Sequence, residues 1–212
     1  MVARNALTTL SETLQKETSA LKRMSERWNA VGGTPKALWL RDAAVYIADF
    51  YSLASIGRSD GDFIIRWVQN REGSLDAINF DLKTRADRYD RLRYLLRAKK
   101  PASSGPIALN YGALGFVYDI SLKKADGSFD GFLHGVFEYR RLLHALSHPE
   151  PGKMPIAEGA ALLINDRVII NNMPRLLPRR SDDLSALFWE RNGISASCCR
   201  PGLRRKRKRP GR

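Results

Sequence analysis

The sequence contains little cysteine and no long apolar run. Only Cys198 and Cys199 occur among its 212 residues, and because they are adjacent they offer neither spaced disulfides nor metal-ligand spacing. No stretch reaches the roughly 18 consecutive apolar residues that a membrane span requires. Met1 to Leu10 also lacks the apolar core of a signal peptide. The sequence as written therefore predicts a soluble chain and leaves its redox compartment open.

Familiar catalytic motifs are also missing. The sequence has no Gly-x-Ser-x-Gly elbow, no phosphate-binding loop ending in Gly-Lys-Ser/Thr and no dinucleotide fingerprint. His144 and His148 have the spacing at which two imidazoles share a metal ion, but the residues between them lack the Glu of a metalloprotease. We interpret them as polar residues at a helix C-terminus and expect a protein that is not an enzyme and has no metal or cofactor. An enzyme without a recognised motif stays an alternative.

Acidic residues are few beside the basic ones, 22 against 36, which gives a net charge of +14. Eight basic residues and no acidic residue lie between Arg200 and Arg212, so the rest of the chain carries 28 basic and 22 acidic residues, or +6. The body is therefore mildly basic, whereas the tail is expected to attract polyanions nonspecifically. A small polyanion- or nucleic-acid-binding protein that acts through this tail is the alternative function.

Apolar periodicity predicts two helices at the start of the chain. One helix face has apolar residues at steps of three, four and seven: Leu7, Leu10, Leu14, Leu21, Met24 and Trp28. The polar Glu17 interrupts this face, so the spacing favours packing on a domain over a coiled coil, and a homodimer through this helix stays open. Gly32, Gly33 and Pro35 end the helix, and a second helix is expected from Lys36 to Asp49.

The remaining pattern predicts an antiparallel sheet with helices. A hairpin is expected first, then a helix, three strands, a short helix and a last hairpin. These elements are Ser52 to Arg58, Phe63 to Gln69, Arg85 to Arg97, Ile107 to Tyr111, Gly115 to Leu122, Phe129 to Phe137, Glu138 to Ser147, and Gly159 to Asn165 with Val168 to Asn171. This order predicts an α+β fold, with a long N-terminal helix followed by a PAS-like antiparallel sheet and flanking helices.

Six segments between Ala20 and Asn171, taken in order, resemble the CHASE-type sensor domain that precedes histidine kinases and diguanylate cyclases in bacterial membrane receptors. They are ALKRMSERW, LWLRDAAVYIADFYSLASIG, FIIRWVQNREGSLDAINFDL, RADRYDRLRYLLRA, PIALNYGALGFVYDISL and DGSFDGFLHGVFEYRRLLHAL. The resemblance implies a non-catalytic input module with a small-molecule ligand, an extracytoplasmic location at the inner membrane, and a kinase or cyclase output module as partner. We expect a helix over 1–34, a sensor domain over 35–190 and a disordered basic tail over 191–212.

The resemblance also implies a ligand pocket between the last strands of the sheet and a covering helix. The candidate ligand-binding residues are Phe80, Asp81, Arg88, Leu109, Tyr111, Phe116 and Tyr118. Because successive residues of a strand point to opposite faces, about half of these candidates are expected to be ordinary core or surface residues.

The chain departs from the family pattern in three places. Asn79 stands near Asp81 and Leu82 where family members have Gly, and Asn tolerates the positive φ that such a turn needs. The usual Pro is absent from the second strand of the three. After Trp189 the apolar periodicity ends and basic residues accumulate. This change favours a truncated or frameshifted receptor fragment without membrane and output parts.

Overall fold

The computed structural model describes residues 2–73, 76–109 and 112–147, and the backbone of four later strands. The chain divides into two compact units. The main unit comprises Ser11–Leu142, and the second unit comprises Met1–Leu10 and Leu143–Arg212. In the second unit, the strands are Gly159–Ile164 (β7), Arg167–Asn171 (β8), Ala186–Trp189 (β9) and Ile194–Cys199 (β10).

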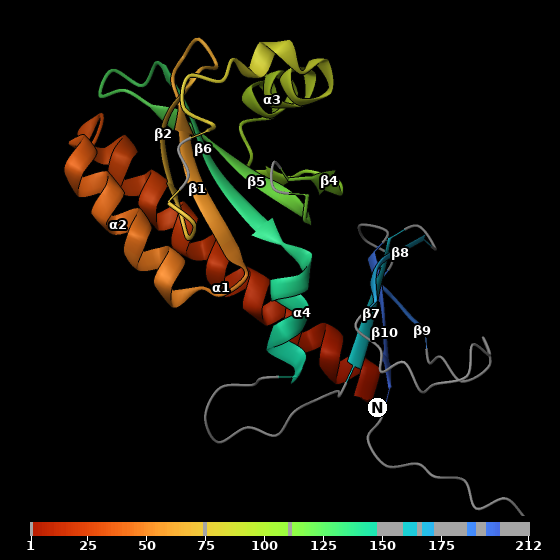
Figure 1. The fold of residues 1–212 in the computed structure, drawn as a ribbon. Coiled ribbons are helices and arrows are strands. Elements are labelled where there is room, and N and C mark those ends of the chain that lie inside the picture. The colour runs from red at the N-terminus through yellow and green to blue at the C-terminus, as the bar shows by residue number, and fades with distance from the viewer. Residues whose placement is uncertain are drawn as a thin grey trace, which may run out of the picture. The chain divides into compact units, whose positions relative to one another are not determined.

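The main unit is built on one antiparallel sheet (Figure 1). Its strand order is β2-β1-β6-β5-β3, and β4 also pairs with β5. The strands are Leu53–Ser59 (β1), Ile65–Asn70 (β2), Ala102–Ser103 (β3), Ile107–Ala108 (β4), Leu114–Lys123 (β5) and Phe129–Glu138 (β6). The predicted α+β, PAS-like fold with a long N-terminal helix is therefore confirmed.

Helices cover both faces of this sheet. The helices of the described chain are Val2–Val31 (α1), Lys36–Asp49 (α2), the short 3-10 helix Leu82–Thr84 (η1), Ala86–Ala98 (α3) and Tyr139–Ser147 (α4), which follows β6. On β6, a Cβ atom added to Gly135 would lie 2.3 Å from Leu21 Cδ1 of α1. The adjacent His134 instead contacts Arg88 of α3. Because successive strand residues point to opposite faces, α1 and α3 cover opposite faces of the sheet.

The apolar face of α1 forms much of the core on its side. Leu21, Met24 and Trp28 are buried, as the periodicity predicts, and Ala20 is buried beside them. Leu14, also predicted for this face, is partly buried. Glu17 interrupts the apolar pattern but is also buried, 3% exposed. Its carboxylate accepts a hydrogen bond from the Ser52 hydroxyl, and burial raises the pKa of Glu17. The interrupted pattern thus marks a polar contact between α1 and the start of β1.

An aromatic cluster holds α1 and α2 against the sheet. The Trp67 ring of β2 lies 5.6 Å from the Trp28 ring of α1 and 5.5 Å from the Trp39 ring of α2. The Arg58 guanidinium lies 4.6 Å from the Trp28 ring and 4.9 Å from the Trp67 ring, and it pairs with Asp130 at 3.3 Å. Such cation–π contacts stabilise a largely desolvated arginine.

Two predicted segments differ in detail from the structure. The strand expected from Ile107 to Tyr111 is only the two residues of β4, because the Leu109 amide donates to the Ala113 carbonyl in a turn. Strand β3 forms inside 99–105, which the Pro and Ser content predicts to be loop. Short pairings of this kind depend on a partner strand, here β5, and leave little trace in a local pattern.

The second unit has its own antiparallel sheet, with the order β8-β7-β10-β9. The predicted last hairpin is confirmed, because β7 pairs with β8. Strand β10 lies within 191–212, which the composition predicts to be a disordered basic tail. It pairs with β7 and β9, whereas Arg200–Arg212 lies outside the described residues.

Gly131 of β6 has a φ of +116°, and an added Cβ atom would lie 1.9 Å from the Ser59 carbonyl oxygen. We therefore expect Gly131→Ala to lower the free energy of unfolding by about 3 kcal/mol, through backbone strain and displacement of β1. Gly127 is a matched control, because it has a φ of +80° and open space around it. Gly127→Ala should cost about 1 kcal/mol. Chemical denaturation followed by circular dichroism measures both, and equal losses would contradict the close packing of β6 on β1.

Candidate functional site

A cavity of about 350 Å³ lies on the α3 side of the sheet. Its wall is mostly apolar and includes Val68, Val117 and Val136 of the sheet, together with Phe80 and Leu109. Charged and polar side chains join this wall from two directions. Arg85, the N-cap residue of α3, and Arg88 of α3 lie on one side, and Asn70, Glu72 and Asp76 come from the end of β2 and the segment after it. Cavities of this size and character are typical of small-molecule sites.

Strand register determines which side chains reach the cavity. Val68, Gly57, His134 and Asp119 are successive cross-strand partners in β2, β1, β6 and β5. The neighbouring row of cross-strand partners on the same face consists of Asn70, Ser55, Val136 and Val117. Gly57 has no side chain, so the space above β1 stays open between Val68 and His134. The cavity is thus floored by two neighbouring rows of the sheet.

A buried ionic cluster closes one side of the cavity. Asp119 is fully buried, and both of its oxygens accept from Arg88, Oδ2 from Nη1 and Oδ1 from Nη2, each at 2.7 Å. His134 Nδ1 lies 2.8 Å from Asp119 Oδ1, and His134 Nε2 lies 2.9 Å from Ser59 Oγ. Arg91 Nε lies 3.6 Å from Asp119 Oδ2. A two-pronged arginine–carboxylate pair of this kind fixes orientation as well as charge.

Electrostatics sets the protonation of the cluster. Burial alone would raise the pKa of Asp119, but the charge of Arg88 and the hydrogen bond from His134 outweigh it and lower this pKa to about 2. Burial lowers the pKa of His134, so its imidazole is neutral at pH 7. Because Asp119 is ionised, Nδ1 of His134 carries the proton and donates to it, and Nε2 accepts from the Ser59 hydroxyl.

Ser59, His134 and Asp119 have the hydrogen-bond order of a nucleophile, a general base and an orienting acid. Ser59 is 0% exposed, however, and is not among the residues that line the cavity. A substrate in the cavity would therefore not reach its hydroxyl. Arg88 also neutralises the carboxylate that would stabilise a histidine cation. We interpret the cluster as a structural support for α3 and for the cavity wall.

The structure separates the predicted ligand-binding residues into three groups. Phe80, Arg88 and Leu109 line the cavity. Asp81, Phe116 and Tyr118 do not line it, and Tyr111 lies outside the described residues. Phe116 stacks on Phe137, with ring centroids 4.9 Å apart, on the α1 side of the sheet. The strand alternation that places Val117 in the cavity thus turns its two neighbours away.

Asp81 has a structural role instead. Its side chain accepts a hydrogen bond from the Lys83 amide at 2.9 Å and so caps η1. The Leu82 amide donates to Phe63, and the Asn79 amide donates to Ile65. Asn79 has a φ of +65°, so the predicted turn with Asn in place of Gly is confirmed. These bonds tie the start of η1 to β2 beside the cavity.

Sequence reasoning missed the residues of the ionic cluster and of the opposite side of the cavity, including Asp119, His134, Glu72 and Asp76. Two signals were present in the sequence. Asp119 is the only charged residue in the apolar run from Phe116 to Leu122. Arg85, Arg88 and Arg91 recur at three-residue steps, which places them on one side of a helix. A buried acid and a row of arginines are complementary, but only the fold reveals their contact.

No group of three or more His, Cys, Asp or Glu side chains in the described part of the chain is arranged to hold a metal ion. His148, one of the two histidines considered as ligands, lies outside that part. Among the helices that the structure describes, none combines the length and apolar character of a membrane span.

Several solved structures have a similar fold, among them three bacterial receptor structures. An extracellular ligand-binding receptor of Desulfohalobium retbaense has a TM-score of 0.69 and 11% identity, over 93% of this chain and 39% of its own length. The ligand-binding domain of an amino-acid chemoreceptor of Pseudomonas aeruginosa, in complex with GABA, has a TM-score of 0.60 and 12% identity, over 92% of this chain and 94% of its own. The ligand-binding domain of a Campylobacter jejuni chemoreceptor, in complex with 4-methylisoleucine, has a TM-score of 0.63 and 8% identity. The match covers 93% of this chain and 86% of that domain.

No protein-family model and no curated protein matches the chain. At identities this low the structural likeness shows the fold alone. The chain therefore has the fold of bacterial extracellular ligand-binding sensor domains.

Replacing Asp119 by Asn should lower the free energy of unfolding by about 3 kcal/mol, because Arg88 loses the charge that compensates its burial. Above pH 3.8, the ordinary pKa of Asp, the wild-type carboxylate contributes on the order of 2 kcal/mol, and this contribution is lost as the pH falls through about 2. The amide in the Asp119→Asn variant does not titrate in this range. Urea denaturation between pH 2 and 7 should therefore give a smaller acid-dependent loss for the variant.

Asp126→Asn serves as the control, since Asp126 is an exposed turn residue whose side chain accepts from the Ser128 amide, as an Asn side chain also can. This variant should stay close to wild type at pH 7. A similar small change for Asp119→Asn would contradict the role of the buried pair.

Proposed function

We propose that this domain is a non-catalytic input module of a bacterial membrane receptor and that its cavity binds a small organic ligand. The observation that carries the proposal is the cavity itself, about 350 Å³ in volume, with a mostly apolar wall and a few charged groups. The Pseudomonas and Campylobacter domains of similar fold bind GABA and 4-methylisoleucine, which supports a small amino-acid-like ligand here. Within the cavity we assign ligand contacts to Phe80, Arg88 and Leu109.

The setting of the domain is part of the same proposal. The resemblance to CHASE-type domains supports an extracytoplasmic position and a histidine kinase or diguanylate cyclase output. The Pseudomonas and Campylobacter domains of similar fold belong to chemoreceptors, which supports a receptor setting. Such a receptor would require membrane and output parts, so the chain would be a fragment of it. Dimerisation through α1 stays a prediction, as does polyanion binding through Arg200–Arg212, which lies outside the described residues.

A chain of contacts connects the cavity with α4. Glu72 lines the cavity and pairs with Arg141 of α4, with 3.4 Å between Oε1 and Nη2. Arg141 also donates from Nε to Glu138 Oε2 at 2.8 Å, and its guanidinium lies 5.3 Å from the Tyr51 ring. A cationic ligand group at Glu72 would compete with Arg141 for this carboxylate. Differential contacts of this kind allow a ligand to shift a conformational equilibrium.

A screen of small metabolites by thermal shift tests the proposal with the full chain. Val136 lies in the floor of the cavity, and Val136→Trp would fill part of its volume. We expect at least one metabolite to raise the melting temperature of the wild type and not that of Val136→Trp. Val45→Trp is the matched control, since Val45 is 51% exposed on α2, and it should respond like the wild type. No response to any metabolite, or an equal response of Val136→Trp, would contradict the assignment.

A further inference from the structure

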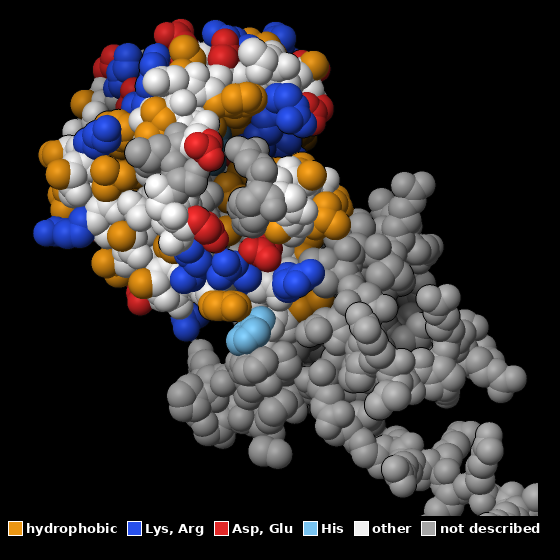
Figure 2. Space-filling model, viewed as in Figure 1, with side chains coloured by type: hydrophobic (Ala, Val, Ile, Leu, Met, Phe, Trp, Pro, Cys, Tyr) orange, Lys and Arg blue, Asp and Glu red, His pale blue; other side chains and the backbone are white. Residues whose placement is uncertain are grey.

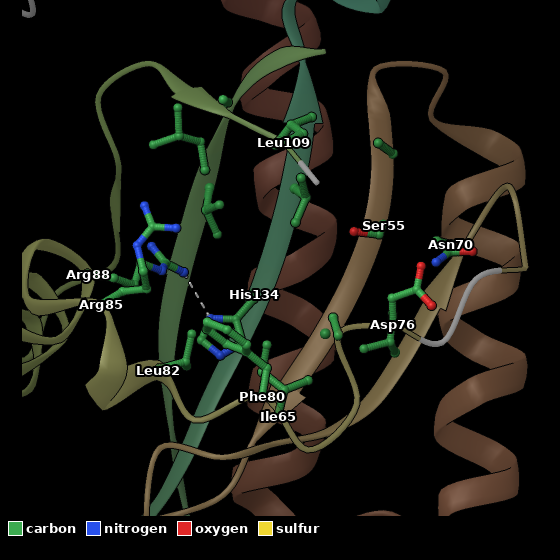
Figure 3. Close-up of a pocket in the computed structure, with 18 of the residues that line it drawn as sticks. Ser55, Ile65, Asn70, Asp76, Phe80, Leu82, Arg85, Arg88, Leu109 and His134 are labelled. Carbon is green, nitrogen blue, oxygen red and sulfur yellow. Dashed lines mark hydrogen bonds between the residues drawn. The ribbon is translucent and has the colours of Figure 1, made fainter. Parts of the chain in front are cut away.

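The two sides of the cavity carry opposite charge. Figure 3 shows Arg85 and Arg88, at the start of α3, on one side and Asn70 and Asp76 on the other, with His134 and Ser55 between them. Figure 2 shows basic side chains gathered over α3 and acidic side chains nearer the middle of the same face. The cavity therefore has a basic end, formed by Arg85 and Arg88, and an acidic end, formed by Glu72 and Asp76.

The basic end keeps a positive charge after its internal ion pairs are counted. The three guanidiniums of Arg85, Arg88 and Arg91 face two carboxylates, those of Asp87 and Asp119, which leaves one net positive charge. His134 adds none, because burial lowers its pKa and keeps the imidazole neutral. Asp119 occupies one N–H of each Nη atom of Arg88, and a guanidinium has five donors. Arg88 therefore retains donors for an anionic group.

The acidic end is lined by two carboxylates, those of Glu72 and Asp76. Glu72 pairs with Arg141 at 3.4 Å. Polar oxygens join these carboxylates, because the Ser55 hydroxyl and the Asn70 amide also line this end. Carboxylate and neutral oxygens together suit an ammonium group, which presents three N–H donors.

The two ends lie several strands apart. Asn70 belongs to the edge strand β2, whereas Arg88 binds over His134 of β6 and Asp119 of β5. Neighbouring strands are about 4.8 Å apart, so β2 and β6 are separated by about 10 Å. The sheet between the ends presents Val68, Gly57 and Val136, which bring no charge. An ammonium and a carboxylate on one carbon atom would not reach both ends.

We propose that the cavity binds a small zwitterion whose ammonium and carboxylate are separated by an apolar chain, an ω-amino acid in preference to an α-amino acid. The carboxylate would contact Arg85 and Arg88, the methylene chain would lie on Val68 and Val136, and the ammonium would contact Glu72 and Asp76. This inference rests on the proposed function, because it names the class of ligand for the same cavity.

Isothermal titration calorimetry with the full chain tests the inference. The probes are γ-aminobutyrate, δ-aminovalerate and ε-aminocaproate, compared with L-valine, L-isoleucine and L-asparagine. We expect at least one ω-amino acid to bind ten times or more tightly than every α-amino acid, with affinity passing through an optimum in chain length. Equal or tighter binding of an α-amino acid, or no binding of any ω-amino acid, would overturn the inference.

Charge-removing variants test the two ends separately. Asp76→Asn and Arg85→Met should each weaken binding of the best ω-amino acid at least tenfold, because each removes charge from one end. Asp90→Asn is the control, since Asp90 is exposed on α3 and does not line the cavity, and it should bind like the wild type. Unchanged binding by Asp76→Asn or by Arg85→Met would overturn the inference.

The test distinguishes failure of the inference from failure of the proposed function. If an α-amino acid or another metabolite binds and Val136→Trp abolishes that binding, the cavity is a ligand site and only the ligand class is wrong. If the ω-amino acids fail and the metabolite screen also yields no compound, both proposals fail.

Discussion

The Asp119 carboxylate is fully buried, and a charge withdrawn from water needs ionic and hydrogen-bonding partners close to it. Arg88 and His134 supply them at 2.7 and 2.8 Å. Arg88 comes from α3, so compensation of this charge requires α3 to lie over β5 and β6. The position of α3 in turn sets one wall of the cavity. A single buried ion pair therefore links the stability of the main unit to the shape of its candidate site.

Such a pair contributes orientation more than net stability. Replacing both partners of a buried ion pair by apolar residues is often neutral, whereas removing one partner is costly. The two parallel bonds between Arg88 and Asp119 fix the guanidinium in one plane, and His134 fixes the carboxylate from a second direction. The Arg88 side chain is thereby held in one orientation at the cavity wall. Pre-organisation of this kind reduces the entropy lost on binding.

Periodicity was sufficient to predict most of the fold, whereas the candidate ligand-binding residues were named from the resemblance to CHASE-type domains. The apolar face of α1, the hairpin of β1 and β2, and helices α2 and α3 each carry a local pattern that matches their burial. Strand β3 was missed because it consists of two residues and is defined by its partner β5. Of the residues named for the site, Phe80, Arg88 and Leu109 line the cavity. Phe116 and Tyr118 point to the other face of β5, and alternation along a strand does not indicate which face holds a cavity.

The contacts that give the cavity its charges come from residues far apart in the sequence. Arg88 and Asp119 are separated by 31 residues, and Glu72 and Arg141 by 69. A short stretch of sequence contains only one partner of such a pair, and no helix or strand propensity requires the pair to form. The two charged ends of the cavity consequently follow from strand order and register, which bring β2, β5, β6 and α3 around one space.

Native-state amide hydrogen exchange in Arg88→Met tests most directly whether the buried pair holds α3 on the sheet. Under conditions in which the variant is folded, the amides of α3 should exchange faster than in the wild type, because their helix opens locally. The amides of α1 within the main unit, on the opposite face, should keep their protection and serve as the internal reference. Unchanged protection of α3 would contradict the account, since α3 would then hold its place without Asp119.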